Sequence, residues 1–470
     1  MAGYEEIFIG GTWVQPDGTE RIPVHNPATE EILASIPVSS PADVDRAVTA
    51  ARSAFDGWSA TSRAERAGYL TALRDALAAR ADEMADLITA EMGTPITIAK
   101  RVQVALPLGV LGSMIELLKG DEEIERVGNS MIVREPVGVV GAITPWNYPL
   151  HQTIAKVAPA LAAGNTVVHK PSEVAPLSAY LLATLMQDIG LPAGVYNLVP
   201  GPGEPTGASI VEHPGVDMVS FTGSTRAGKL VSAGAAASVK RVALELGGKS
   251  ANVLLPDADL ATAVKVGVSN CYLNGGQTCT AWTRMLVPAS RYDEAVELAV
   301  QAAAKFAPGD PTDAKTRLGP MASAAQRDRV NGYIERGVAE GAKQVLGGDP
   351  VPERGYYVAP TVFADVSPDS TIAQEEIFGP VLSIIRYEDE DDALRIANSV
   401  VYGLAGGVWS ADVDHAVAFA RKMRTGQVDI NGAAFNVLAP FGGFKQSGNG
   451  RELGAHGLAE FTEVKSVQLP

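Results

Sequence analysis

The chain has 470 residues, of which 46% are hydrophobic and 20% charged, a composition typical of a globular protein with two or three domains. It contains 38 Lys and Arg against 54 Asp and Glu, so the formal net charge is −16 at pH 7. Such an acidic chain repels polyanions, because its overall field opposes the charge of a phosphate backbone. Nucleic acid is therefore not expected as a partner.

The cysteines and histidines argue against a disulfide framework and against a resident metal. Cys271 and Cys279 are the only two cysteines, too few for a disulfide scaffold or a cysteine-rich zinc module. The six histidines are scattered, and no two of them have the i, i+4 spacing of a helical metal site. We expect no bound metal.

No targeting or membrane-spanning segment is predicted. The chain begins Met-Ala-Gly-Tyr-Glu-Glu, without the basic region and apolar run of a signal peptide. The longest uncharged run, residues 137–155, contains two prolines together with Asn147, His151 and Gln152, which disfavour a membrane helix. These features predict a cytoplasmic protein that does not bind a membrane.

The first half of the chain predicts short strands, then helices, then alternating strands and helices. Asp17-Gly18 is typical of a hairpin turn, and Asn26-Pro27 marks a second break. Ser40-Pro41 predicts a helix towards residue 55, and the capping box that opens at Ser62 predicts a helical stretch towards residue 92. Further strands are predicted at residues 129–134, 137–143, 166–169, 196–199 and 218–222, with helices at 151–163, 175–189 and 224–237.

A second series of alternating elements begins after a boundary near residue 250. Strands are predicted at residues 252–255, 284–287 and 381–386, and helices at 260–273, 291–306 and 323–340. Strands that alternate with helices in this way indicate parallel βαβ units. The expected fold class is therefore α/β.

Two segments imitate a phosphate-binding loop. The segment from Gly223 to Lys229 has the correct spacing, but Leu230 stands where a hydroxyl residue would hold magnesium. The segment ending Gly248-Lys249-Ser250 lacks its first glycine, which is Ala243, and carries an acidic residue that would repel phosphate. Both departures disfavour a nucleoside-triphosphatase, whereas a glycine turn before a helix still favours a dinucleotide pyrophosphate.

Two residues stand out as candidates for a chemical role. Cys279 lies in a loop of small and polar residues that leaves a thiol approachable, although a lone intracellular cysteine is more often a small buried hydrophobe. Glu245 lies between Leu244 and Leu246, where a carboxylate is costly unless it is exposed or has a task.

Two further residues suit ligand binding. Asn147 lies between Pro145 and Pro149, and a rigid amide donor suits an oxyanion site, although asparagine is also common in ordinary turns. Lys170 follows a predicted strand, where a lysine can bind ribose hydroxyls or phosphate or belong to an ordinary loop.

In their order and spacing, these residues resemble the NAD(P)-dependent aldehyde dehydrogenases, over residues 26–467. Eight segments carry the resemblance, and all eight occur in the family's order. They are Thr144-Pro-Trp-Asn-Tyr-Pro149, His169-Lys-Pro-Ser-Glu173, Phe221-Thr-Gly-Ser-Thr225, Leu244-Glu-Leu-Gly-Gly-Lys249, Gly276-Gln-Thr-Cys279, Glu375-Glu-Ile-Phe-Gly-Pro380, Pro440-Phe-Gly-Gly-Phe-Lys-Gln-Ser-Gly448 and Thr462-Glu-Val-Lys465.

The resemblance implies a catalytic set. Cys279 would attack the aldehyde carbon, and the Asn147 amide with the Cys279 backbone N–H would hold the oxyanion. Hydride would leave the thiohemiacetal for the nicotinamide, and Glu245 would act as general base for the water that hydrolyses the thioester. A free thiol has a pKa of about 8.5, so the thiolate is scarce at neutral pH unless the site favours it. The base needs a pKa raised by burial.

The resemblance also implies NAD as cofactor. Glu173 bears on this choice, because a carboxylate accepts from ribose hydroxyls and repels a 2′-phosphate, whereas Lys170 leaves use of NADP open. The implied contacts are Lys170 and Glu173 at the adenosine ribose, Gly223 and Ser224 at the pyrophosphate, Trp146 beside it, Glu376 at the nicotinamide ribose and Phe378 near the ring.

Aromatic residues dominate the implied substrate tunnel. They suit an apolar aldehyde, aliphatic or aromatic, and none of these positions is an arginine that would pair with a semialdehyde carboxylate. The loop near Arg284 could contribute one, so a semialdehyde dehydrogenase stays an alternative. The implied tunnel residues are Tyr148, Gln152, Trp282, Phe435 and Phe441.

The implied architecture has three parts, and homodimers or homotetramers are expected. A Rossmann-like NAD-binding domain would comprise residues 1–119 and 137–247, an α/β catalytic domain residues 248–435, and a small β oligomerisation element residues 120–136 and 436–470. A coenzyme A-acylating relative is disfavoured by Glu245, since water activation explains a base there. A catalytically silent relative is disfavoured by the joint presence of Cys279, Glu245 and Asn147.

Overall fold

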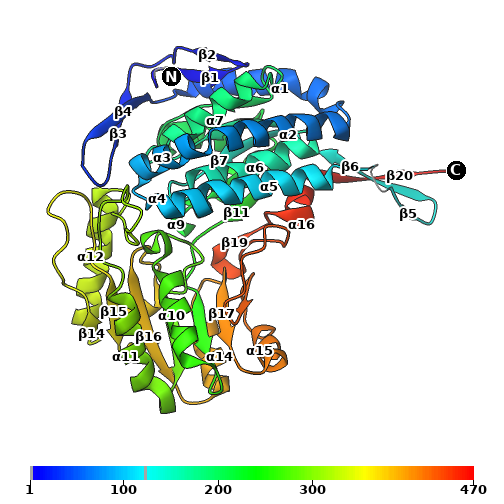
Figure 1. Ribbon diagram of the computed structural model, residues 1–470. Coiled ribbons are helices and arrows are strands. Elements are labelled where there is room, and N and C mark those ends of the chain that lie inside the picture. Colours follow the sequence, from blue (N-terminus) through cyan, green and yellow to red (C-terminus); the bar gives the residue numbers. More distant parts are fainter. Residues whose placement is uncertain (1–3, 121–123) are drawn as a thin grey trace.

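The computed structural model describes residues 4–120 and 124–470. Figure 1 shows two α/β bodies, one above the other, and a slender β arm that projects from the upper body. The expectation of an α/β fold is confirmed. Residues 121–123 of the predicted oligomerisation element, and the first three residues of the chain, lie outside the described residues.

The upper body is built on an eight-stranded sheet of order β19-β11-β10-β7-β8-β9-β1-β2. The strands from β11 to β9 in this order are parallel, and the edge strands add antiparallel. Every residue of β7, β8 and β10 is buried, as expected for a parallel sheet covered on both faces. The bounds are β1 (Ile7–Ile9), β2 (Thr12–Val14), β7 (Val139–Ile143), β8 (Thr166–Lys170), β9 (Tyr196–Leu198), β10 (Met218–Thr222), β11 (Arg241–Glu245) and β19 (Gly448–Asn449).

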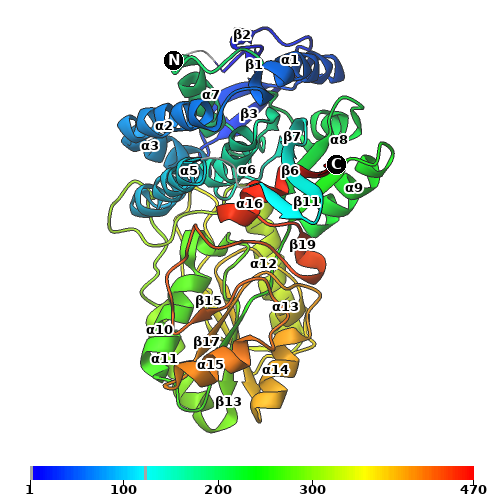
Figure 2. The ribbon, with the colours of Figure 1, turned by 90° about the vertical axis from the view of Figure 1, so that its right-hand side faces the viewer.

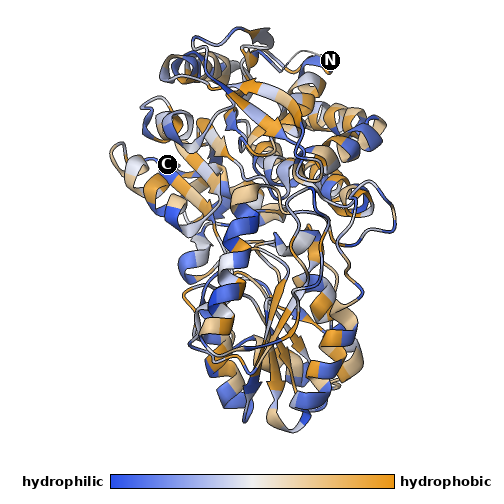
Figure 3. Ribbon diagram, turned by 90° about the vertical axis from the view of Figure 1, so that its left-hand side faces the viewer, coloured by the Kyte–Doolittle hydropathy of each residue, from blue (hydrophilic) through white to orange (hydrophobic). Residues whose placement is uncertain are grey.

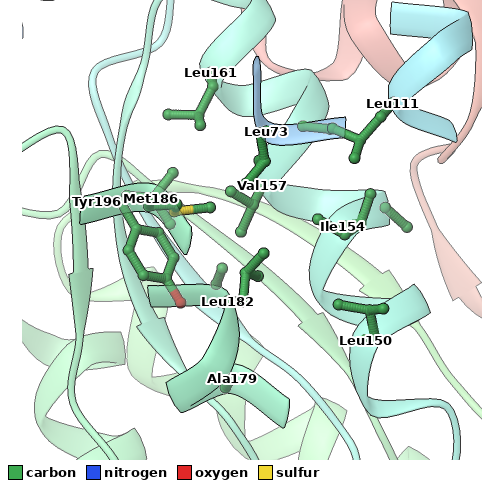
Figure 4. Close-up of a cluster of buried hydrophobic side chains, with 14 of the residues drawn as sticks. Leu73, Leu111, Leu150, Ile154, Val157, Leu161, Ala179, Leu182, Met186 and Tyr196 are labelled. Atoms are coloured by element: carbon green, nitrogen blue, oxygen red, sulfur yellow. The ribbon is translucent and has the colours of Figure 1, made fainter. Parts of the chain in front are cut away.

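Helices cover this sheet, and their apolar side chains form the core of the upper body. Figure 4 shows leucine, isoleucine and valine side chains of α6 packed against α2, α5 and α7. Burial of each large apolar side chain contributes about 1.5–3 kcal/mol. The bounds are α1 (Pro41–Ser59), α2 (Arg63–Ala79), α3 (Ala81–Met92), α5 (Ala105–Leu117), α6 (Pro149–Ala163), α7 (Leu177–Asp188), α8 (Ala208–Glu212), α9 (Thr225–Ala236) and α16 (Gly454–Glu460).

The lower body contains a seven-stranded sheet of order β14-β15-β16-β13-β12-β17-β18, parallel except for β14. Figure 3 shows its strands as hydrophobic and the flanking helices as hydrophilic on parts of their surface. The strands are β12 (Ala251–Leu254), β13 (Arg284–Pro288), β14 (Lys343–Leu346), β15 (Thr361–Ala364), β16 (Val381–Tyr387), β17 (Gly406–Trp409) and β18 (Asp429–Ile430). The helices are α10 (Leu260–Cys271), α11 (Tyr292–Ala303), α12 (Ala324–Ala339), α13 (Thr371–Gln374), α14 (Glu390–Asn398) and α15 (Val413–Ala420).

The projecting arm is a three-stranded antiparallel sheet of order β20-β6-β5 (Figures 1 and 2). It joins β5 (Glu125–Val127) and β6 (Ser130–Pro136) to the C-terminal strand β20 (Thr462–Gln468). A separate hairpin pairs β3 (Arg21–His25) with β4 (Ile32–Pro37). The arm therefore joins two segments that are far apart in the sequence.

Two local predictions were wrong. The Asp17-Gly18 pair does not close a hairpin, because it connects β2 and β3, which belong to different sheets. The hairpin turns instead at Gly10-Gly11, where both residues have positive φ, as the favoured two-residue turns require. The predicted helical stretch from residue 62 to 92 is two helices that meet at Arg80, which has a non-helical backbone and pairs with Glu83.

One long helical segment was not predicted from the sequence. It consists of α4 (Ile96–Ile98), a π-helical stretch at Ala99–Val104 and α5. Within the described residues, Ile96–Leu117 is the one helical segment with the length and composition of a membrane span, and half of its most apolar window is buried within the protein. Because α5 packs against α2 and α6, we assign it to the core of the upper body.

Candidate active site

A cavity of about 460 Å³ lies where the carboxyl ends of three parallel strands meet the lower body. The segments after β7, β10 and β11 form one wall, and α12 with the loop after α13 forms the other. Ligands of open parallel sheets bind at this position, beyond the carboxyl ends of the strands. Five predicted cofactor residues contribute to the lining: Trp146, Gly223, Ser224, Glu376 and Phe378.

The chemistry of this lining fits a dinucleotide. Ser224 caps α9, so the first N–H groups of that helix lie at the cavity and suit a pyrophosphate. Glu376 accepts a hydrogen bond from the Gly248 N–H at 3.0 Å through one carboxylate oxygen, which leaves the other for a hydroxyl. Burial raises the pKa of Glu376 to about 7. The rings of Trp146 and Phe378 pack edge to face, with their centroids 5.3 Å apart, and form an apolar wall.

The residue before Gly248, Gly247, has no room for a side chain. A Cβ at this position would lie 2.2 Å from a carboxylate oxygen of Glu376, too close for any side chain. The backbone therefore approaches the carboxylate directly, and this approach holds Glu376 at the cavity.

Lys170 and Glu173 lie outside the lining of this cavity. Lys170 Nζ donates to the carbonyl oxygens of Pro171 and Gly201, each at 2.7 Å, and lies 3.7 Å from Glu173 Oε2. Lys170 is the last residue of β8 and Glu173 follows this strand, which neighbours β7 in the sheet. The structure therefore brings these two residues together, and their contact with an adenosine ribose stays a prediction.

A second cavity, of about 330 Å³, opens beside the first. We call the first the cofactor cavity and the second the substrate cavity, after the predicted residues that line them. All five predicted tunnel residues line it, namely Tyr148, Gln152, Trp282, Phe435 and Phe441. Leu106, Val266 and Leu453 add apolar surface. Cys279 is the one described residue that lines both cavities. A thiol at this junction can contact a substrate in one cavity and a cofactor in the other.

A tight turn places Cys279 at the junction. Asn274, Gly275 and Gly276 all have positive φ, and a Cβ on Gly276 would lie 2.1 Å from the carbonyl oxygen of Gly379. Burial, with smaller contributions from the carboxyl groups of Glu376 and Glu245, raises the pKa of the Cys279 thiol to about 12. The protein groups around the thiol therefore do not favour the thiolate.

Buried hydrogen bonds hold Asn147 in place. Its Nδ2 donates to the Gln277 carbonyl oxygen at 3.0 Å, which leaves one amide N–H for an oxyanion. The backbone carbonyl oxygen of Asn147 accepts hydrogen bonds from Gln103 Nε2 at 3.0 Å and from Asn274 Nδ2 at 2.9 Å. The sequence analysis missed Gln103, because only the fold brings this π-helical residue to Asn147.

Glu245 is 4% exposed and ends β11. Neither of its carboxylate oxygens has a hydrogen-bond partner among the described residues. Burial and the neighbouring carboxyl group of Glu452 raise the pKa of Glu245 well above its usual value. The exposed alternative for Glu245 is therefore wrong, although this residue lines neither cavity.

A buried ion pair adjoins Glu245. Lys156 Nζ contacts Glu452 and donates to Thr222 Oγ1 at 2.6 Å, and Glu452 also lines the substrate cavity. The sequence analysis missed this pair, because its members are 296 residues apart and carry no local pattern.

Arg284, whose loop was left open as a source of an arginine for the tunnel, does not supply one. Its guanidinium is buried in the lower body, where it donates to the carbonyl oxygens of Lys249, Ile396 and Ala397, and it does not line the substrate cavity. Arg101, on the π-helical stretch, lines that cavity instead. No hydrogen bond or ion pair occupies its guanidinium within the part of the chain that the structure describes.

The model of the aldehyde dehydrogenase family matches residues 13–467. A 3-succinoylsemialdehyde-pyridine dehydrogenase of Pseudomonas sp is 52% identical over 99% of both chains. A geranial dehydrogenase of Castellaniella defragrans is 47% identical, again over 99% of both chains.

Solved structures agree with these matches. Aldehyde dehydrogenase C of Pseudomonas syringae, a cysteine-to-alanine mutant with NAD+ and octanal, is 48% identical with a TM-score of 0.98, over 99% of this chain and 96% of that one. A Mycobacterium tuberculosis aldehyde dehydrogenase with NAD+ is 45% identical with a TM-score of 0.97, over 100% and 98%. The resemblance and the choice of NAD as cofactor are confirmed. The chain belongs to the aldehyde dehydrogenase family and catalyses the NAD-dependent oxidation of an aldehyde.

Proposed function

We propose that the enzyme oxidises apolar aldehydes, aliphatic or aromatic, with Cys279 as the nucleophile. The position of Cys279 at the junction of the two cavities carries this proposal. The aromatic and aliphatic lining of the substrate cavity supports the substrate class, because such walls gain from burial of a hydrocarbon chain or ring. The structural relative with bound octanal, and the relative named for geranial, are consistent with this class.

Each step follows from a side chain already described. Cys279 Sγ, after its proton passes to solvent water, bonds to the carbonyl carbon as the π bond of the carbonyl group opens. The second N–H of the Asn147 amide stabilises the oxygen that becomes negative. Gly223, Ser224 and Glu376 would hold NAD, which would supply the acceptor for the hydride that leaves the same carbon. The thioester on Cys279 is then attacked by water, whose proton passes to Glu245, and the carbon–sulfur bond breaks to release the acid.

Glu245 favours water over coenzyme A as the acyl acceptor. Its buried carboxyl group has a raised pKa and unpartnered oxygens, as a general base near neutral pH requires. A thiol acceptor would need less activation than water. The proposal is therefore a hydrolytic enzyme.

A direct assay tests this proposal. Purified enzyme with NAD is offered acetaldehyde, octanal, benzaldehyde and succinic semialdehyde, each with and without coenzyme A, and NADH absorbance is followed. Turnover that is independent of coenzyme A, with octanal or benzaldehyde at the highest kcat/KM, is the expected result. A strict requirement for coenzyme A, or a preference for acetaldehyde, would contradict it.

Arg101 favours a second candidate, an aldehyde with a carboxylate or carbonyl at its far end. Its cation lines the substrate cavity without a protein partner among the described residues, and one relative is named for a semialdehyde. If this candidate is correct, Arg101→Leu lowers kcat/KM for succinic semialdehyde by up to about fivefold, because one exposed ion pair contributes about 0.2–1 kcal/mol, and leaves kcat/KM for octanal unchanged. Equal effects on both substrates would argue against it.

The proposed assembly and location complete this account. We propose that the three domains have the limits predicted from the sequence. We also propose that the chain forms a homo-oligomer through the arm. The arm presents an unpaired edge on β20, and Val464 on that strand is 59% exposed. Two free cysteines are compatible with the reducing cytoplasm. Light scattering of Val464→Glu beside the unmodified enzyme tests the assembly, because a lower mass is expected.

A further inference from the structure

A small cavity in the lower body is separate from the two that meet at Cys279. It leaves about 10 Å³ of free space for the centre of a water-sized sphere, close to the room that one water molecule needs. Tyr402 lines both this cavity and the cofactor cavity, so the two are neighbours. The polar residues of its lining are Lys249, Ser250, Arg284, Asn398, Tyr402, Arg424 and Thr425.

The charges of this lining are all positive. Lys249, Arg284 and Arg424 contribute cations, and the lining contains no Asp or Glu. Lys249 and Arg284 are both fully buried, whereas Arg424 is exposed at the rim. Two buried cations that share one cavity destabilise each other unless a negative charge compensates them.

Several buried polar groups of this cavity also have no partner. Lys249 Nζ, Ser250 Oγ and Thr425 Oγ1 make no hydrogen bond within the described residues. Arg284 donates to three carbonyl oxygens through Nε, Nη1 and Nη2, which uses three of the five N–H groups of a guanidinium. A buried polar group without a partner costs about 1–3 kcal/mol, and more when it is charged. Three such groups around one cavity indicate a ligand that accepts hydrogen bonds.

We propose that this cavity binds one small monovalent anion of the halide class, held by Lys249 Nζ and by the hydroxyl groups of Ser250 and Thr425. A cation would be repelled by this lining. A water molecule would accept the same hydrogen bonds but would add no negative charge beside Lys249 and Arg284. The small free volume favours a monatomic anion over a larger oxyanion.

The charge state of Lys249 links anion binding to pH. Arg284 on β13, Cys271 on α10, and Glu375 and Glu376 after α13 face this lysine. Burial, followed by the repulsion from Arg284, lowers the pKa of Lys249 to about 7. Only the protonated lysine attracts an anion, so the affinity for halide is highest below this pKa and falls as the pH rises through it.

The cavity is also connected to the active site through the backbone. Lys249 directly follows Gly248, whose N–H holds Glu376 and whose Cα carries no side chain because a Cβ would lie 2.4 Å from the Cys279 carbonyl oxygen. An anion that fixes Lys249 would therefore stabilise the turn that supports both Glu376 and Cys279. This inference does not depend on which aldehyde is the substrate.

Diffraction from crystals of the unmodified enzyme soaked in sodium bromide tests the site directly. The expected result is an anomalous bromide peak within hydrogen-bonding distance of Lys249 Nζ. Ordinary water density without an anomalous signal would overturn the proposal, and this outcome does not depend on any variant that fails to fold.

Thermal unfolding provides the solution test. The Tm of the unmodified enzyme is measured at pH 6 and pH 9 in sodium chloride and in sodium gluconate of equal ionic strength, because gluconate is too large for the cavity. A higher Tm in chloride is expected, with the larger difference at pH 6. Lys249→Met should lose this difference, whereas Lys265→Met, which alters an exposed lysine on α10, should keep it. Equal Tm values in both salts at pH 6 would contradict the proposal.

Discussion

The two cavities that meet at Cys279 are built in different ways. The cofactor cavity is formed largely by the backbone ends of three adjacent strands and the N-terminus of α9, with Glu376 facing them. The substrate cavity is formed by side chains from the π-helical stretch, α6, α10 and loops after residue 426. The cofactor cavity therefore depends on backbone geometry, and the substrate cavity depends on side-chain identity.

This difference explains what each cavity can select. Backbone N–H groups and a fixed carboxylate suit the pyrophosphate and ribose hydroxyls that dinucleotides have in common. Side chains from distant elements change one by one without disturbing a sheet, so the substrate cavity can be altered while the chemistry at Cys279 stays the same. Relatives named for different aldehydes share the fold of this chain.

The sharpest way to test this division is to remove the thiol that the two cavities share. Cys279→Ala should lower turnover with every aldehyde by at least about 10³-fold, because no covalent intermediate can form. NAD binding, measured by calorimetry, should be unchanged, since the cofactor wall stays intact. Surviving turnover would remove Cys279 from the mechanism.

Loss of the general base should separate the two half-reactions. Glu245→Gln should lower steady-state turnover by about 10²–10⁴-fold and leave a burst of NADH close to one per active site, because hydride transfer precedes hydrolysis. Rapid-mixing absorbance measures the burst. Normal steady-state turnover would contradict the role of Glu245.

The oxyanion donor should affect the first half-reaction. Asn147→Ala should lower kcat/KM by about 10²–10³-fold, the usual cost of one such donor, and should abolish the burst. Gln103→Leu is a useful companion variant, because it leaves the Asn147 amide in place and removes the Gln103 hydrogen bonds to the Asn147 backbone carbonyl and to the Thr94 hydroxyl. We expect a smaller loss for this variant, and an equal loss would mean that position rather than the amide itself limits the rate.

The buried ion pair should set the pH dependence of hydrolysis. The pKa of Glu245 is raised by burial and by Glu452, and a base works only when deprotonated, so kcat should increase as the pH rises through that pKa. Glu452→Gln removes the repelling carboxylate and leaves the Lys156 cation, so the rising limb should move to lower pH. A limb that stays in place or moves upward would contradict this electrostatic account.

The smallest effect is expected at the adenosine end of the cofactor. Glu173→Ser should raise kcat/KM for NADP relative to NAD by up to about tenfold, because it removes one repulsive charge next to Lys170. Coupled steady-state assays with both cofactors give the ratio. If the ratio does not change, another residue discriminates at the 2′ position.

The sequence by itself determined the parts of this protein that depend on local pattern. Alternating β-branched runs and capped helices predicted the parallel α/β fold, because these signals act within a few residues. The segments around Asn147, Glu245 and Cys279 identified the family, because the chemistry fixes both residue type and spacing. The same segments contain the glycines at which the backbone approaches Glu376 and Cys279.

The tertiary structure alone decided which distant residues meet. Gln103 supports Asn147 across 44 residues of sequence, and Lys156 pairs with Glu452 across 296. Arg101 likewise reaches the substrate cavity only because distant elements pack together. Arg284 shows the converse, because the sequence left open a contribution from its loop to the tunnel, whereas its side chain donates to the carbonyl oxygens of Ile396 and Ala397. Such contacts depend on how separate elements pack, and no local pattern records that packing.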